Sequence, residues 1–202
     1  MYAIIQAGGR SARMGEDKSW LLIAGQPMIE HVLTAAQNVA ERCALVIHPG
    51  NPHSSRYEEL AARWNAKLLV DLHDYRGPLG GIETALRQCD ENEDALILAC
   101  DLPFLTREFL TLLREIHETE KNELTVPFDL QGRPQMLAAV YAASCLGAVA
   151  AMLSANELKA RCLQERVTTR IVSFAEYAHL PNAEQYLLNI NTPKTWEQYR
   201  ER

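Results

Sequence analysis

The sequence predicts an α/β fold built on a single doubly wound, mostly parallel sheet. Apolar segments of strand length alternate along the chain with segments whose apolar residues recur at helical spacing. The run Ala95–Cys100 is apolar without interruption, as expected of a central parallel strand covered on both faces. No repeat, low-complexity tract or Pro/Gly-rich linker divides the 202 residues, so we expect residues 1–202 to form one domain.

The first half of the chain is expected to begin as strand, loop and helix. Residues 2–6 form a short apolar run, and residues 27–40 carry a proline near their start and apolar residues at helical spacing. The same criteria predict strands at 44–47 and 67–70, a helix between them at 56–64, and a helix that follows Gly80-Gly81 as far as about Cys89.

The second half continues the alternation. Thr106 follows the central apolar run and is a residue type that caps helices, so we expect a helix from there to about His117. The remaining expected elements are strands at 124–127, 136–141 and 169–174, helices at 143–154 and 158–164, and a closing helix around Trp196. Ligands of doubly wound sheets bind outside the carboxyl ends of the strands, which is where we look for a site.

Charge and composition argue against several classes of protein. The formal net charge of −6 disfavours broad electrostatic binding to nucleic acid or to an anionic membrane surface. No apolar run approaches the ~20 residues of a membrane span, and the first residues lack the pattern of a signal peptide, so we expect a cytoplasmic protein. The five cysteines and six histidines show neither disulfide nor transition-metal spacing, which leaves Mg²⁺ open as a cofactor.

The stretch Ala7–Lys18 is the first candidate site, because it places three glycines and three cations directly after an apolar run. Glycine lets peptide N–H groups approach an anion closely, while Arg10, Arg13 and Lys18 can supply positive charge. The stretch has neither the Gly-Lys-Ser/Thr ending of a P-loop nor the Gly-x-Gly-x-x-Gly spacing of dinucleotide-binding folds. The glycines alone would fit an ordinary turn, but the clustered cations favour a triphosphate site.

Two aspartates follow expected strands. Asp101 comes directly after the central strand, where it is our candidate Mg²⁺ ligand, because this hard cation takes oxygen ligands and commonly needs only one or two carboxylates besides substrate phosphates. Asp71 follows the strand at 67–70 and precedes the glycine-rich turn with Gly80 and Gly81, whose free N–H groups suit an anion. An aspartate that only forms a turn is the alternative in both places.

Two further segments carry polar residues towards the same edge. The turn at 131–135 brings Arg133, for which a solvated hairpin arginine is the default interpretation. Asn189 and Asn191 alternate in an extended segment, so their amides would project to the same side and could bind a polar substrate. Capping of the last helix by Asn191 or Thr192, with Pro193 in its first turn, is the alternative and leaves one asparagine unexplained.

Four motifs together resemble those of the molybdenum cofactor guanylyltransferases, within the nucleotidyltransferase superfamily. The first is shared widely in that superfamily, whereas the last points more narrowly to the molybdopterin branch. The resemblance spans nearly the whole chain and implies a Rossmann-like nucleotidyltransferase fold. The motifs are Ala7–Lys18, Gly-Pro-Leu-Gly-Gly at 77–81, Cys-Asp-Leu-Pro at 100–103 and Asn-Ile-Asn-Thr-Pro at 189–193.

The resemblance implies an enzyme that binds GTP and Mg²⁺ and lets the terminal phosphate of molybdopterin attack the α-phosphorus. Pyrophosphate leaves, and molybdopterin guanine dinucleotide forms. Molybdoenzymes or cofactor chaperones are implied as protein partners. The implied catalytic residues are Lys18, Asp101 and Arg13, with Asp101 on the metal; the nucleotide-binding residues are Gln6, Ala7, Gly8, Gly9, Lys18, Asp71 and Asp101; the substrate-binding residues are Gly80, Gly81, Arg133, Asn189 and Asn191.

Three alternatives stay open at this point. A cytidylyltransferase for the same cofactor is one, because Gln6 stands where the family usually has leucine. A nucleotidyltransferase for a sugar or alcohol phosphate would keep Lys18 and Asp101 but need no pterin site. A non-catalytic protein that binds nucleotide or cofactor and delivers it to a partner enzyme would need neither residue.

Overall fold

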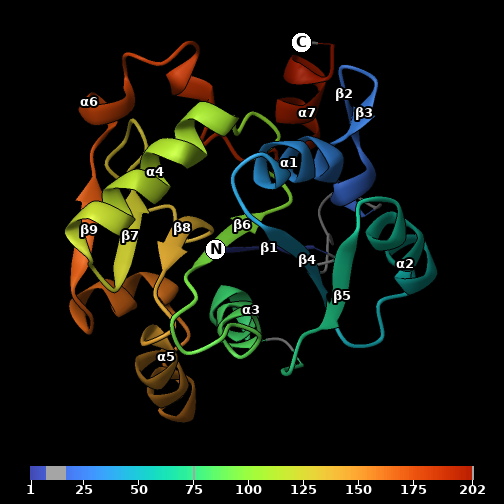
Figure 1. The fold of residues 1–202 in the computed structure, drawn as a ribbon. Helices are drawn as coiled ribbons and strands as arrows, with labels where there is room; N and C mark the ends of the chain where they lie inside the picture. The colour runs from blue at the N-terminus through green and yellow to red at the C-terminus, as the bar shows by residue number, and fades with distance from the viewer. Residues whose placement is uncertain (8–16, 75, 202) are drawn as a thin grey trace.

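A seven-stranded sheet organises the fold, with the strand order β5-β4-β1-β6-β8-β7-β9 (Figure 1). The computed structural model describes residues 1–7, 17–74 and 76–201. Only β8 runs against its neighbours, so the predicted mostly parallel sheet and its seven strands are confirmed. The strands are β1 Tyr2–Gln6, β4 Arg42–Ile47, β5 Ala66–Val70, β6 Ala95–Ala99, β7 Leu124–Pro127, β8 Ala138–Tyr141 and β9 Thr169–Val172.

Helices cover both faces of this sheet, as a doubly wound fold requires (Figure 1). The central strand β1 shows the reason, because Ala3 and Ile5 pack into the core on one face while Tyr2 and Ile4 pack into the core on the other. No helix in the described part of the chain is long and apolar enough to cross a membrane. One face carries α1 Met28–Gln37, α2 Ser54–Arg63 and α4 Arg107–Glu120, and the other carries α3 Gly77–Leu86 and α5 Cys145–Ser154.

Helix α3 begins earlier than the sequence analysis predicts. It starts at Gly77, not after Gly81, so both Gly80 and Gly81 lie inside the helix. Gly77 has φ +62°, which glycine adopts at little cost, and Pro78 at the first turn is preorganised for a helix. Every residue from Leu79 to Leu86 is buried, so packing against the sheet outweighs the poor helix propensity of two glycines.

Other boundaries follow the local capping chemistry. Thr106 caps α4 as predicted, and its hydroxyl accepts a hydrogen bond from the Phe109 N–H at 3.3 Å. The last strand ends at Val172, earlier than predicted, because Ser173 and Glu176 form a capping box that starts the short helix α6 Phe174–Tyr177. Thr192 caps the closing helix α7 Pro193–Tyr199.

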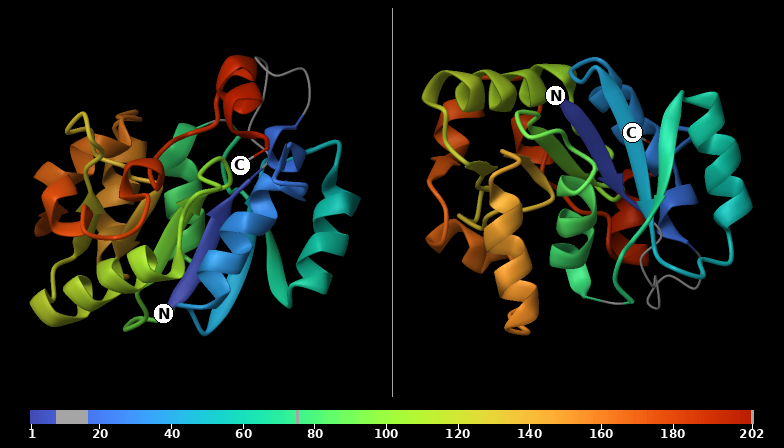
Figure 2. Two further views of the ribbon diagram at one scale, coloured as in Figure 1. Left: turned by 90° about the horizontal axis from the view of Figure 1, so that it is seen from above. Right: turned by 60° about the horizontal axis from the view of Figure 1, so that its bottom comes forward.

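The sequence analysis did not predict several short elements, among them a hairpin that lies against the closing helix α7 (Figure 2). The Trp196 indole N–H of α7 donates to the Leu22 carbonyl at 2.9 Å, and the Ala24 N–H donates to the Arg200 carbonyl at 2.8 Å. A hairpin of two-residue strands gives no hydrophobic period to detect, which is why it was missed. These elements are η1 Lys18–Trp20, β2 Leu22–Ile23, β3 Gln26–Pro27 and η3 Ala183–Gln185; η2 Ala160–Glu165 corresponds to the predicted helix at 158–164.

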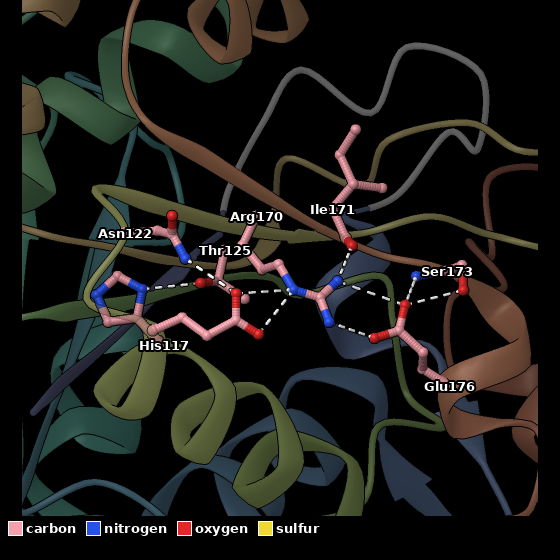
Figure 3. Close-up of polar contacts among 8 residues, drawn as sticks. His117, Asn122, Thr125, Arg170, Ile171, Ser173 and Glu176 are labelled. Carbon is pink, nitrogen blue, oxygen red and sulfur yellow. Dashed lines mark hydrogen bonds and ion pairs between the residues drawn. The ribbon is translucent and has the colours of Figure 1, made fainter.

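Ion pairs hold the edge strand β9 against the helices beside it (Figure 3). The Arg170 side chain donates to both oxygens of Glu120 on α4 at 3.0 Å, and its other nitrogens bind Glu176 on α6. Ser173 donates to the same Glu176 carboxylate from its N–H and its hydroxyl. Hydrogen bonds from Arg170 and Ser173 lower the pKa of Glu176 to about 2, although partial burial acts in the opposite direction.

We predict that Glu176→Gln destabilises the protein in a pH-dependent way. The folded pKa lies below the ordinary value of 4.5, so the ionised carboxylate stabilises the fold above about pH 4.5, and this contribution is lost as the pH falls towards 2. We expect a loss of about 1 kcal/mol at pH 7, discounted for the carboxylate's partial exposure, and a smaller loss near pH 3. Denaturant unfolding at several pH values measures both. Glu184→Gln, at an exposed position of η3, is the control, and an equal loss at all pH values would contradict the role of the charge.

Candidate active site

A pocket of about 490 Å³ lies at the carboxyl ends of the parallel strands. Gln6 at the end of β1, Asp71 after β5 and Asp101 after β6 all line it. The strand order runs from β1 to β4 and β5 on one side and to β6 on the other. The junction of β1 and β6 is therefore a topological switch point, where doubly wound sheets bind their ligands. Of the residues singled out in the sequence, Gln6, Ala7, Lys18, Asp71, Gly81, Asp101 and Asn189 line this pocket.

Lys18, Asp101 and Asn191 meet beside the pocket although they are far apart in the sequence. The Lys18 ammonium donates to the Asp101 carboxylate and to the Asn191 side-chain oxygen, the latter at 2.9 Å. The Ile190 N–H donates to the Asp101 carbonyl at 3.0 Å, and the Ile190 side chain is fully buried. The extended segment is therefore held against the end of β6, with Asn189 and Asn191 on either side of a core residue.

Burial makes the charges of this cluster depend on one another. Asp101 is only 5% exposed, and the Lys18 side chain is 22% exposed. Burial alone would lower the pKa of Lys18, but the Asp101 carboxylate outweighs it and raises the pKa above the ordinary value of 10.5. Lys18 is therefore a cation at neutral pH, held at a fixed place in the site.

One oxygen of Asp101 has no hydrogen-bond partner among the residues that the structure describes. This oxygen, Oδ1, is buried, and a buried carboxylate oxygen without a donor is costly unless a cation or ligand completes it. The described residues contain no group of three or more His, Cys, Asp or Glu side chains placed to hold a metal. A hard cation that binds Asp101 can take further ligands from substrate phosphates and water.

Asp71 both shapes its turn and lines the pocket. Its Oδ1 accepts hydrogen bonds from the His73 N–H at 3.1 Å and from the Thr84 hydroxyl at 2.8 Å. The turn-forming role considered from the sequence therefore exists, and it fixes the carboxylate against α3. The side chain is half-buried at the pocket wall, where it can still meet a ligand.

Gly81 allows Gln6 to lie directly against α3. A Cβ atom at position 81 would lie 2.5–2.7 Å from the Gln6 amide atoms, which is closer than van der Waals contact permits. The Gln6 amide nitrogen donates to the Pro78 carbonyl at 3.3 Å, so the side chain is held across the first turn of the helix. The glycine thus matters for close packing of the pocket wall.

A second pocket, also of about 490 Å³, adjoins the first and shares Pro134, Gln135 and Asn189 with it. Arg133 and Asn191 line only the second pocket. The Arg133 guanidinium is largely exposed and lies 2.7 Å from an Asp129 oxygen, so this arginine does not reach the first pocket wall. Three of the five residues predicted to bind the second substrate, Arg133, Asn189 and Asn191, are therefore brought together here.

The remaining predicted residues lie elsewhere or outside the described part of the chain. Gly80 is buried in α3, where an added Cβ would lie 3.0 Å from the Arg76 Cβ, and it lines neither pocket. Gly8, Gly9, Arg10 and Arg13 lie outside the described residues.

Three polar residues that line the first pocket, His48, Arg76 and Gln135, were not among the predicted site residues. His48 directly follows β4, so the strand-end rule that found Asp71 and Asp101 could have found it. Arg76 precedes α3 and could have been found as a cation at a helix start. No sequence signal places Gln135 between the two pockets, because that depends on how the 128–137 connection folds back.

The fold and site define an α/β protein with a pocket at a topological switch point, lined by a partly buried lysine and a buried aspartate. The family described as the MobA-like NTP transferase domain matches residues 3–170. The chain belongs to this family, among the molybdenum cofactor guanylyltransferases, and is a nucleotidyltransferase. The resemblance read from the sequence is confirmed, and the chain serves nucleotidyl transfer in molybdenum cofactor biosynthesis.

Individual relatives cover most of the chain. A probable molybdenum cofactor guanylyltransferase of Carboxydothermus hydrogenoformans is 34% identical over 193 residues, which are 96% of this chain and 91% of the relative. A protein of the same description from Methanothermobacter thermautotrophicus is 34% identical over 167 residues, 82% of this chain and 83% of the relative. The crystal structure of molybdopterin-guanine dinucleotide biosynthesis protein A from Archaeoglobus fulgidus has the same fold, with a TM-score of 0.83, 24% identity, and coverage of 100% and 97%.

We predict that Gly81→Ala weakens nucleoside triphosphate binding without destabilising the protein. Alanine favours the helix, but its Cβ forces the Gln6 amide out of its place in the pocket wall. The expected loss of affinity is about 3- to 10-fold, the size of one hydrogen bond, measured by calorimetric titration with GTP and Mg²⁺.

Gly147→Ala is the matched control, because Gly147 lies inside α5 and an added Cβ there would meet nothing within 4 Å. Both variants should gain helix propensity, and only Gly81→Ala should lose affinity. Equal affinities in the two variants would show that Gln6 does not contribute to the nucleotide site.

Proposed function

We propose that the chain transfers GMP from GTP to the terminal phosphate of molybdopterin, forming molybdopterin guanine dinucleotide. An oxygen of that phosphate forms a bond to the α-phosphorus of GTP, the bond from the α-phosphorus to the bridging oxygen breaks, and pyrophosphate leaves. The observation that carries the proposal is the meeting of Lys18, Asp101 and Asn191 between two adjoining pockets. Two substrates can then approach one charged centre from two sides.

The first pocket is assigned to the nucleotide. Its size suits a small molecule, and its lining combines apolar walls with polar groups at the strand ends. The backbone at Gln6 and Ala7 would contact the base and the ribose, and Asp71 would also contact the nucleotide. Gly81 allows α3 to lie close to Gln6. Gly8, Gly9 and Arg13 belong to the same proposed site, with the glycine N–H groups and the arginine serving the phosphates.

The second pocket is assigned to the acceptor. It is lined by Arg133, Asn189 and Asn191, and it includes the aromatic side chains of Phe174 and Tyr177. Amide groups can hydrogen-bond a pterin-like heterocycle, and apolar surface can cover its rings. Asn189 lines both pockets, and Asn191 contacts Lys18, so an acceptor bound here would present its phosphate towards the charged centre.

Lys18 and Asp101 are assigned the charge stabilisation that nucleotidyl transfer needs. The Lys18 cation would stabilise negative charge on the phosphate oxygens as it develops in the transition state. Asp101 Oδ1, which has no hydrogen-bond partner within the described part of the chain, fits Mg²⁺, a hard cation that prefers carboxylate oxygen. When bound, the metal would neutralise phosphate charge and orient the triphosphate. Asp101 also holds Lys18 in place while no ligand competes for its oxygens.

The alternatives differ from this proposal at identifiable places. A cytidylyltransferase would differ only around the base, where Gln6 and His48 line the pocket. A nucleotidyltransferase for a sugar or alcohol phosphate would use Lys18 and Asp101 in the same way but not the second pocket. A delivery protein would gain nothing from the contact of Lys18 with the buried Asp101, whose desolvation is costly.

Pyrophosphate release with Mg²⁺ and molybdopterin, compared for GTP, CTP, ATP and UTP, tests the proposal directly. Turnover with GTP alone is the expected result. Turnover with CTP would make the chain a cytidylyltransferase. Turnover only when a sugar phosphate replaces molybdopterin would remove the acceptor assignment, and no turnover with any pair would favour a non-catalytic role.

We predict that Asp101→Asn lowers kcat by about 10²- to 10³-fold or more, the usual cost of removing one electrostatic group from an active site. The substitution keeps the shape of the side chain but removes the carboxylate that would hold Mg²⁺ and that raises the pKa of Lys18. Circular dichroism checks that the fold is retained. Asp90→Asn is the control, because the Asp90 side chain is 94% exposed and lies at the opposite, amino-terminal end of β6. Unchanged turnover in Asp101→Asn would remove Asp101 from the metal role.

A further inference from the structure

A buried hydrogen-bond network that joins Asp17, Tyr57, Ser19 and Cys100 is not explained by the proposed reaction. Its centre is the hydroxyl of Tyr57 on α2, a residue with no exposed surface. The Tyr57 oxygen lies 2.7 Å from the Asp17 carboxylate and 2.8 Å from the Ser19 hydroxyl. Tyr57 lines neither of the two pockets described above.

The donor and acceptor roles of Tyr57 and Asp17 in this network follow from the chemistry of their side chains. An ionised carboxylate only accepts hydrogen bonds, so the single hydroxyl proton of Tyr57 goes to Asp17. The Ser19 hydroxyl oxygen lies between the Tyr57 hydroxyl and the Cys100 sulfur and is 3.3 Å from that sulfur.

This hydrogen-bond network holds the residues on both sides of Lys18. Asp17 caps η1, and its second oxygen accepts from the Ser19 N–H at 3.1 Å. The residues directly before and after Lys18 are thus both held by one hydroxyl from α2. Cys100, at the far end of the hydrogen-bond network, directly precedes Asp101 in the sequence.

Aromatic packing fixes Tyr57 itself. The rings of Tyr57 and Trp20 have their centroids 5.1 Å apart, and the Arg56 guanidinium lies 3.8 Å from the Trp20 ring. The Tyr57 ring is therefore held by packing, while its hydroxyl binds Asp17 and Ser19 on either side of Lys18.

We propose that Tyr57 is a positioning residue, whose hydroxyl fixes the Asp17-Lys18-Ser19 turn so that the Lys18 ammonium meets Asp101 and the substrate phosphates. A lysine side chain has four rotatable bonds, so its place in the site depends on where its backbone starts. Small displacements of a catalytic group cost orders of magnitude in rate. The effect on turnover rests on the proposed function, whereas the effect on Lys18 itself does not.

Tyr57→Phe tests the proposal, because it keeps the ring and removes only the hydroxyl. Its matched control is Tyr186→Phe, since Tyr186 is also buried, at 2% exposure, and its hydroxyl donates to the Pro181 carbonyl at 2.7 Å outside both pockets. We expect kcat to fall about 10-fold in Tyr57→Phe, with KM for GTP within about 2-fold, because the lost contact aids the transition state more than binding. Tyr186→Phe should lose similar thermal stability and keep kcat. Ser19→Ala should lower kcat in the same direction as Tyr57→Phe.

The acylation rate of Lys18 by a small amine-reactive reagent, followed by mass spectrometry, gives a readout that needs no substrate. Exposed Lys159 is the internal standard. We expect Lys18 to react several-fold faster, relative to Lys159, in Tyr57→Phe and Ser19→Ala than in the wild type, because its contact with Asp101 is loosened. Tyr186→Phe should leave the ratio unchanged.

Wild-type Lys18 reactivity in Tyr57→Phe and Ser19→Ala would overturn the proposal. Faster labelling with wild-type kcat would overturn it too, since the position of Lys18 would then not limit turnover. Absence of pyrophosphate release from the wild type with every nucleotide would defeat the proposed function instead, and the labelling ratio would still decide whether Tyr57 positions Lys18.

Discussion

The contact between the Lys18 ammonium and the Asp101 carboxylate is the interaction on which the rest of the site depends. Asp101 is buried and Lys18 is partly buried, so each charge loses hydration and the attraction between them helps to offset that loss. The contact joins η1 to the end of β6, one of the two strands that flank the switch point. Asn191 completes it from a segment near the other end of the chain.

The surrounding fold provides what this pair requires. Strand β1 is covered on both faces, so its carboxyl end is held firmly by the core. Helix α3 packs close enough to β1 for Gln6 to lie against Gly81. The core contact of Ile190 and the hydrogen bond from its N–H to Asp101 hold the asparagine segment in register with the end of β6. The two pockets are therefore separated by residues that the core itself holds in place.

Much of this could be predicted from the sequence, and the rest could not for physical reasons. The alternating pattern and the apolar run before Asp101 predicted the sheet, and the strand-end rule then placed Asp71 and Asp101 at one pocket. The start of α3 was missed because burial outweighed the propensity of Gly80 and Gly81, which no local pattern reports. The contact of Lys18 with Asn191 spans 173 positions, and the Tyr57 hydroxyl serves a turn 40 positions away; only the folded chain brings such residues together.

A crystal structure with a nucleoside triphosphate and Mn²⁺ in place of Mg²⁺ would test the central claim most directly, because the anomalous signal locates the metal without assumptions about the ligand. The account predicts a metal peak within coordination distance of Asp101 Oδ1, the triphosphate in the first pocket and the Lys18 ammonium on its phosphates. A metal bound away from Asp101, with the Lys18–Asp101 contact unchanged and the nucleotide elsewhere, would contradict it.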